Sequence, residues 1–261
     1  MTDISKMSYS ILDKAEVSIF LFHPRYSLRM SDRDMAIPVG NDIVVGAKFH
    51  MTKKSAPNIL FFHGNGEIVA DYDDIGQMYE QLGINFLPVD YRGYGHSTGK
   101  PKASLIMQDC HVIFKYVKKW LKENAYTGRM ILMGRSLGSA SVLEIAAHHK
   151  KQFDALIIES GFAHTGPLLR LLGTDIHSLN LSEDKGFRNL DKIREVATPT
   201  LIIHAEHDHI IPFSDGQALY DICPAEDKTL LKIPEANHND IFLRGSSDYM
   251  TAIKALTERI A

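Results

Sequence analysis

Short runs of apolar residues recur along the chain, and several of them are continuous instead of alternating with polar residues, for example ILFF, MILM and LIIH. Continuous runs of this length are typical of strands buried on both faces, as in a parallel sheet covered by helices. The runs occupy residues 43–50, 58–62, 85–89, 129–133, 155–158, 200–204 and 229–233. A weaker run near residues 34–38 predicts an eighth strand.

The segments between these runs have the period of amphipathic helices. In residues 104–121 the apolar positions recur at spacings of three and four, and Ser104 is a candidate N-cap. A second apolar stripe ends at Leu82, and Gly83 follows where a C-terminal cap belongs. The alternation predicts an α/β fold, with a mostly parallel eight-stranded sheet and helices on both faces. We expect a single domain over residues 1–261.

Residues 161–199 interrupt this alternation, because a connection of that length usually holds more than one crossover helix. We expect a short lid or substrate-binding insert here. Its apolar residues are Phe162, Leu168, Leu169, Leu171, Leu172 and Ile176. The five from Leu168 to Ile176 are predicted to share one buried helix face. Phe162, Leu168 and Leu172 are the candidate substrate-pocket residues, and the alternative is that this helix only covers the sheet.

Composition excludes several classes of protein. Apolar residues make up 44% of the chain and charged residues 23%, with a formal net charge of -3, so we expect a packed core and no nucleic-acid partner. Cys110 and Cys223 form no CxxC pair, and no disulfide framework is predicted. The first 25 residues lack a basic segment followed by an apolar one, and no apolar run is long enough to span a membrane. We expect a cytoplasmic protein.

The motif Gly134-Arg135-Ser136-Leu137-Gly138 follows the run RMILM directly and opens a helical stretch. This strand–turn–helix context is that of a nucleophile elbow, in which a strained turn exposes a serine at the end of a strand. Glycines on both sides let neighbouring elements approach closely. We predict Ser136 as nucleophile and the backbone N–H of Leu137 as an oxyanion-hole donor. The alternative is an ordinary glycine-rich turn.

A second motif, His63-Gly64-Asn65-Gly66, follows the run NILFF. A loop at this position supplies the other oxyanion-hole N–H in folds with a nucleophile elbow, and we assign it to the backbone of Asn65. His63 is predicted to be a structural histidine that stabilises the loop. The alternative is a plain strand-to-helix turn.

A serine hydroxyl needs a base, and the base needs an orienting partner. After a nucleophile elbow the chain order is serine, acid, histidine. Asp208 and His238 come in this order, each just beyond a predicted strand. We predict His238 as general base and Asp208 as the acid, with Glu159 and Glu206 as competing carboxylates.

Two further motifs are better explained without a ligand. Residues 93–99, GYGHSTG, are spaced GxGxxxG and follow an interior strand, which favours a tight turn over a dinucleotide fingerprint. Residues 204–209, HAEHDH, carry metal-ligating side chains, but alternate residues of an extended segment point in opposite directions. His207 and His209 are therefore expected to face away from His204, Glu206 and Asp208. We predict no cofactor and no metal.

Six motifs together resemble one family. They are FHPR at residues 22–25, FFHGNGE at 61–67, DYRGYGHSTG at 90–99, GRSLGS at 134–139, HAEHDHIIP at 204–212 and NHND at 237–240. This set is similar to the abhydrolase-domain serine hydrolases of the α/β-hydrolase superfamily, whose eukaryotic members include protein depalmitoylases. The resemblance implies hydrolysis of an ester or thioester substrate without a cofactor, and it supports the triad Ser136, Asp208 and His238. An aminopeptidase-like hydrolase and a non-catalytic binding protein on the same scaffold are the alternatives.

Overall fold

The structure is a computed structural model that describes residues 7–27, 31–40 and 42–261. Within these residues eight strands form one sheet in the order β1-β2-β4-β3-β5-β6-β7-β8. The strands are β1 (Asp34–Gly40), β2 (Ile43–Lys48), β3 (Asn58–Phe62), β4 (Asn85–Val89), β5 (Met130–Arg135), β6 (Ala155–Glu159), β7 (Thr200–Ala205) and β8 (Lys228–Ile233). The pairs β1–β2 and β2–β4 are antiparallel, and all other pairs are parallel. The predicted eight-stranded, mostly parallel sheet is confirmed.

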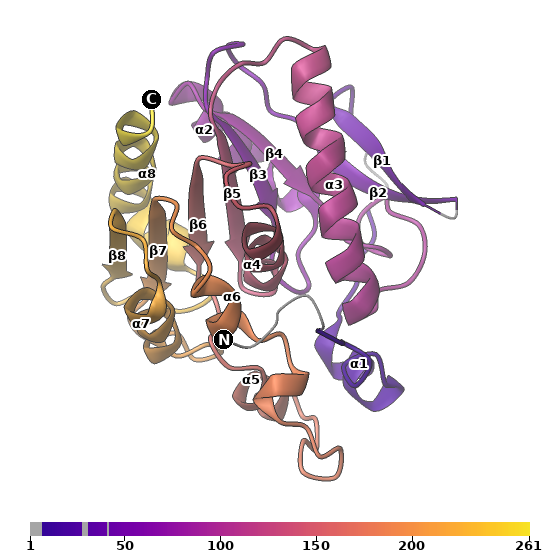
Figure 1. Cartoon of the computed structure of the whole chain (residues 1–261). Helices are drawn as coiled ribbons and strands as arrows, with labels where there is room; N and C mark the ends of the chain where they lie inside the picture. Colours follow the sequence, from indigo (N-terminus) through magenta and orange to yellow (C-terminus); the bar gives the residue numbers. More distant parts are fainter. Residues whose placement is uncertain (1–6, 28–30, 41) are drawn as a thin grey trace.

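Helices cover both faces of the sheet, as predicted (Figure 1). One face carries α3 (Ala103–Glu123), α4 (Gly138–His148), α6 (Asn189–Ile193) and α7 (Phe213–Ile222). The other carries η2 (Val69–Tyr72), α2 (Asp73–Gln81) and α8 (Ile241–Arg259). Two short helices, α1 (Ala15–Leu21) and α5 (Thr165–Leu171), contact each other beyond one end of the sheet, on the side to which β7 and β8 point.

The sequences of the central strands are continuously apolar because helices cover both faces of these strands. All five residues of β3 are buried. Leu60 and Phe62 join the apolar cluster under α3 and α4, whereas Ile59 and Phe61 join the cluster under α2 and α8. Successive side chains of a strand point to opposite faces, so residues 59–62, which helices cover on both sides, are all apolar. Full burial of each such side chain contributes about 1.5–3 kcal/mol.

The two predicted helix boundaries have different outcomes. Gly83 adopts the left-handed conformation with φ +72° just after α2, as a C-terminal cap requires. Ser104 is not the N-cap of α3, because the helix begins at Ala103 and Lys102 occupies the N-cap position. The Ser104 hydroxyl instead donates to the carboxylate of Asp13, whose other oxygen accepts the Ser104 N–H at 3.0 Å. A long-range partner has replaced the local cap, and it ties the N-terminal segment to α3.

Residues 161–199 contain α5, the short 3-10 helix η3 (Glu183–Lys185) and α6. Leu169 and Ile176 are buried, but Leu171 is 57% exposed. The prediction of one continuous buried face from Leu168 to Ile176 is therefore wrong. Helix α5 ends at Leu171, with Gly173 at φ +102° just beyond, so Ile176 reaches the core from a separate turn.

The structure also bears on the cysteines and on the membrane-spanning prediction. Cys110 and Cys223 are both buried, and neither forms a disulfide. Across the residues that the structure describes, no helix combines the length and apolar character needed to cross a bilayer. Residues 1–6, part of the N-terminal stretch used for the targeting prediction, lie outside the described residues.

Candidate active site

Three loops at the carboxyl ends of β5, β7 and β8 bring Ser136, Asp208 and His238 together. Nδ1 of His238 lies 2.7 Å from Oδ2 of Asp208, and Nε2 of His238 lies 3.2 Å from Oγ of Ser136. All three residues are buried, and Ser136 keeps 9% of its surface exposed. The predicted serine, histidine and acid thus form a continuous chain of hydrogen-bond contacts.

The turn that carries Ser136 has the strained geometry expected of a nucleophile elbow. Ser136 adopts φ +50°, a left-handed conformation that side chains other than glycine rarely take. A Cβ on Gly134 would stand 2.3 Å from the carbonyl oxygen of Gly138, and one on Gly138 would stand 2.0 Å from that of Phe62. Both positions therefore require glycine. The tight packing of α4 against β3 and β5 holds Ser136 at the end of its strand.

Asp208 is held as a carboxylate by several donors. Its Oδ1 accepts the backbone N–H groups of Ile210 and Ile211 at 3.0 and 2.8 Å. Burial alone would raise the pKa of Asp208, but the hydrogen bond and charge of His238 outweigh burial and lower that pKa. An ionised Asp208 accepts the Nδ1 proton of His238, which leaves Nε2 free to accept a proton from Ser136.

The two competing carboxylates have other partners. Glu159 accepts hydrogen bonds from Arg135 at 2.5 Å and from the Tyr249 hydroxyl at 2.6 Å. Glu206 pairs with Lys232 at 2.7 Å. Since Asp208 contacts His238 and both rivals are engaged elsewhere, the geometry favours Asp208 as the orienting acid.

The two candidate oxyanion-hole groups are the backbone amides of Asn65 and Leu137. Within the described part of the chain, neither N–H donates a hydrogen bond to a protein acceptor. Leu137 is the residue before α4, so its amide lies at the positive end of the helix dipole. Two free amides that follow β3 and β5 fit the prediction that they bind a developing oxyanion.

The Asn65 side chain has a role that the sequence did not reveal. Its Oδ1 accepts the backbone N–H of His23 and the hydroxyl of Tyr94, each within 3.0 Å, and its Nδ2 donates to the carbonyl of Leu21. Arg25 adds a hydrogen bond to the carbonyl of Gly66 at 3.1 Å. The FHPR segment at the end of α1 therefore braces the loop that carries the Asn65 amide.

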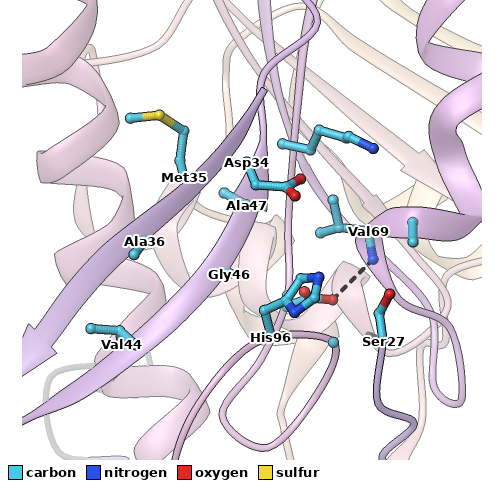
Figure 2. Close-up of a pocket in the computed structure, with 13 residues that line it drawn as sticks. Ser27, Asp34, Met35, Ala36, Val44, Gly46, Ala47, Val69 and His96 are labelled. Carbon is cyan, nitrogen blue, oxygen red and sulfur yellow. Dashed lines mark hydrogen bonds between the residues drawn. The ribbon is translucent and has the colours of Figure 1, made fainter. Parts of the chain in front are cut away.

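His63 is a structural residue, as predicted. Its fully buried ring donates from Nδ1 to the carbonyl of Gly64 at 2.8 Å and from Nε2 to Asp90 at 3.2 Å. Burial alone would lower the pKa of His63, but Asp90 outweighs burial and raises it. The same Asp90 oxygen accepts the Val69 N–H, the dashed line in Figure 2, at a cavity between β2 and η2. The hydrogen bond between His63 and Asp90 therefore fixes the start of the loop that carries Asn65.

The expectation for the first discounted motif is met, and that for the second is met in part. In residues 93–99, Gly93, Gly95 and Gly99 all have positive φ, and the Gly93 N–H donates to the Thr98 carbonyl, which closes a tight turn. In residues 204–209, His204 and Asp208 are buried whereas His207 and His209 are exposed, as alternation predicts. Glu206 and His207 do not face apart, because the chain turns after β7 and brings Nε2 of His207 to 4.0 Å from Oε2 of Glu206. The absence of a cofactor and of a metal stays a prediction.

Comparison with known proteins agrees with this geometry. Residues 53–181 and 184–242 match the family model described as serine aminopeptidase, S33. The chain belongs to this α/β-hydrolase family. Alpha/beta hydrolase domain-containing protein aho-3 of Caenorhabditis elegans is 31% identical over 195 residues, which cover 72% of this chain and 54% of that protein. Human alpha/beta hydrolase domain-containing protein 17C is 30% identical over 189 residues, or 71% and 54% of the two chains.

The chain thus spans about half the length of the curated relatives it matches. Among solved structures, the Pyrococcus furiosus esterase Pf2001 superposes with a TM-score of 0.72 at 16% identity, over 91% of this chain and 99% of that one. Est1E from Butyrivibrio proteoclasticus gives 0.69 at 17% identity, over 87% and 98%. At these identities the two esterases establish the α/β-hydrolase fold alone.

In this α/β-hydrolase a mostly apolar cavity of about 270 Å³ lies between α5 and the loop that carries Asp208. Its lining residues are Phe162, Pro167, Leu168, Leu171, Asp208, His209, Ile210, Ile211, Pro212 and Asp215. Two of the predicted pocket residues, Phe162 and Leu168, line it. Leu172 does not, and Leu171 takes that place. The cavity shares Asp208 with the triad, so it lies beside the candidate active site.

Proposed function

We propose that this α/β-hydrolase is a serine hydrolase that cleaves a carboxylic ester or thioester through an acyl-enzyme intermediate. The observation that supports this most directly is the contact chain from Asp208 through His238 to Ser136, with distances of 2.7 and 3.2 Å. The backbone amides of Asn65 and Leu137, which donate to no acceptor among the described residues, support the expected oxyanion hole.

In the acylation step, Oγ of Ser136 attacks the substrate carbonyl carbon while Nε2 of His238 accepts the hydroxyl proton. The carbonyl oxygen becomes an oxyanion that accepts hydrogen bonds from the Asn65 and Leu137 amides, each worth about 3 kcal/mol in the transition state. His238 then protonates the leaving alcohol or thiol as its bond to the carbonyl carbon breaks. Asp208 stabilises the imidazolium throughout and stays ionised.

In the deacylation step, water repeats the attack. His238 takes a proton from the water as its oxygen adds to the acyl carbon, and the same two amides bind the second oxyanion. His238 returns the proton to Oγ of Ser136 when the acyl–oxygen bond breaks, which releases a carboxylic acid. These steps use only protein groups and water.

The apolar cavity beside Asp208 supports an acyl group of modest length as the bound part of the substrate. Leu168 and Leu171 of α5 give the cavity an apolar wall, and the fully buried Phe162 also lines it. We assign residues 161–199 as the substrate-binding insert of the domain. The two unpaired cysteines fit a reducing compartment, so we propose a cytoplasmic location.

An aminopeptidase is the second candidate, because the matching family model carries that description. Such an enzyme needs an anion for the substrate's ammonium group. Asp215 lines the cavity, but its Oδ2 accepts the backbone N–H groups of Ala163 and His164 at 2.8 and 3.3 Å. This engagement makes Asp215 a poor ammonium site and favours the ester or thioester.

One experiment tests the proposal against its rivals. The wild-type protein and Ser136→Ala are treated with a fluorophosphonate and then assayed on p-nitrophenyl esters, acyl thioesters, lactones and aminoacyl p-nitroanilides. We expect wild-type labelling and ester or thioester turnover, both lost in the variant. Absence of wild-type labelling would identify a non-catalytic binding protein, and turnover confined to the anilides would identify a peptidase.

A further inference from the structure

Arg135, the residue before Ser136, donates hydrogen bonds to two separate loops and to the last residue of β6. It is 7% exposed, and its guanidinium donates from Nε to Glu67 at 2.9 Å, from Nη1 to Glu159 at 2.5 Å and from Nη2 to the carbonyl oxygen of His238 at 2.7 Å. We propose that Arg135 is a positioning residue that holds the general base and the oxyanion loop in register with Ser136. This inference rests on the proposed function.

The first arm fixes the backbone of the general base. His238 lies in the connection between β8 and α8, outside any regular element. Arg135 is the last residue of β5, where it pairs with Glu159 of β6 in the middle of the sheet. The bond from Nη2 to the His238 carbonyl therefore ties a loop residue to a rigid strand. Because Ser136 follows Arg135 directly, the same tie sets the spacing between base and nucleophile.

The second arm fixes the oxyanion loop. Glu67 accepts Arg135 on Oε1, and its Oε2 accepts the N–H of Gly64 at 2.7 Å and the hydroxyl of Tyr72 at 2.5 Å. A Cβ on Gly64 would stand 2.8 Å from that Oε2, so glycine is what lets the carboxylate reach the backbone. Gly64 immediately precedes Asn65. Arg135 thus acts on the Asn65 amide through the Glu67 carboxylate and the adjoining Gly64 peptide.

Charge holds the cluster together. Burial alone would lower the pKa of Arg135, but the carboxylates of Glu159 and Glu67 outweigh burial and raise it. Burial alone would raise the pKa of Glu67, but the charge of Arg135 outweighs it and lowers that pKa to about 2. Arg135 and Glu67 are therefore ionised at neutral pH. A purely structural role would need only this neutralisation, whereas positioning also needs the directions of the three N–H groups.

Lysine separates the two roles, because it keeps the positive charge but replaces a planar fork of donors by a single nitrogen. Arg135→Lys cannot bond three acceptors that lie around a guanidinium. The matched control is Arg92→Lys. Arg92 is also a buried arginine, 9% exposed, and it pairs with Asp109 of α3 instead of an active-site loop. Each variant removes one buried guanidinium. Only Arg135→Lys also removes hydrogen bonds to the loops that carry Asn65 and His238.

The experiment measures kcat and KM for an ester substrate together with the far-downfield proton resonance of the His238–Asp208 hydrogen bond. For Arg135→Lys we expect kcat to fall about 100-fold with KM nearly unchanged, because a displacement near 1 Å has that effect on rate. The resonance should shift or broaden. Arg92→Lys should keep both the wild-type kcat and the wild-type resonance, even if its melting temperature drops.

Each outcome decides the proposal. A wild-type kcat and an unshifted resonance in Arg135→Lys would overturn the positioning role while leaving the proposed function intact. If the wild-type protein shows no turnover, the proposed function fails, and the resonance still reports whether Arg135 positions His238. If Arg135→Lys does not fold, Glu67→Gln tests the second arm, because its amide cannot accept both Arg135 and Gly64. A Glu67→Gln protein with wild-type kcat would overturn that arm.

Discussion

Nδ1 of His238 lies 2.7 Å from Oδ2 of Asp208, and this contact selects which nitrogen of the imidazole carries the proton. Because the acid is ionised, it holds the proton on Nδ1 and leaves a lone pair on Nε2. That lone pair faces Ser136 at 3.2 Å. In the proposed mechanism Asp208 therefore acts on Ser136 through the tautomer of His238.

Asp208→Asn should keep the shape of the site and favour the wrong tautomer, because an amide can donate its N–H₂ to Nδ1. We expect kcat to fall by about 10⁴, with slow fluorophosphonate labelling still detectable. The control is Glu206→Gln, which removes a competing carboxylate that pairs with Lys232. Equal losses in the two variants would contradict the assignment of the acid.

Ser136→Ala should abolish labelling and reduce turnover by about 10⁶, as in a triad whose members act as one unit. Folding should be almost unaffected, because alanine at φ +50° meets the same strain as serine. Intact-protein mass after labelling and a thermal melt together check both statements. A labelled Ser136→Ala protein would move the nucleophile to another residue.

The fold and the grouping of Ser136, Asp208 and His238 were predictable because both depend on local patterns. Continuous runs such as NILFF identify strands covered on both faces, and the elbow motif depends on glycines at fixed offsets from Ser136. The order of Ser136, Asp208 and His238 then follows from the order of the strands. Each signal is visible within a few residues of the sequence.

The supporting contacts were not predictable, because their partners lie far apart in the chain. Arg135 meets Glu67 and His238 across 68 and 103 positions, and no local pattern marks those pairs. Ser104 had the sequence of an N-cap, yet Asp13, 91 positions away, captures its hydroxyl. Leu171 fits an apolar stripe, but α5 ends there and leaves it exposed. Long-range polar contacts and helix length come from tertiary packing.

The buried ion pair of Glu67 predicts a specific acid sensitivity. Its pKa is lowered from an ordinary value of 4.5 to about 2, so its ionised form favours the folded state above pH 4.5, and this contribution is lost as pH falls toward 2. Its side chain is 26% exposed, and the shift corresponds to at most about 3 kcal/mol. Glu67→Gln should therefore be less stable than wild type at pH 7, with the gap closing at low pH.

Urea unfolding at pH 7, 4.5, 3 and 2.5 measures this gap in the free energy of unfolding. Glu258→Gln is the control, because Glu258 is 66% exposed and pairs with Lys254 at the surface. It should follow the wild-type curve at every pH. A gap between Glu67→Gln and wild type that stays constant from pH 7 to 2.5 would show that the Glu67 charge does not stabilise the fold.

The last prediction concerns the cavity of about 270 Å³ beside Asp208. If it binds the acyl chain, each methylene that enters it contributes about 0.8 kcal/mol until the space is filled. The kcat/KM for p-nitrophenyl esters should therefore climb over the shortest chains and fall by about C8.

Leu168→Trp places a larger side chain in the cavity and should move the optimum to shorter chains. Leu243→Trp is the control, since Leu243 is 82% exposed on α8 and lines no part of this cavity. Two results would place the acyl chain elsewhere. One is an optimum that does not move in Leu168→Trp. The other is a kcat/KM that keeps rising to C16 in wild type, because a cavity of this size has no room for so long a chain.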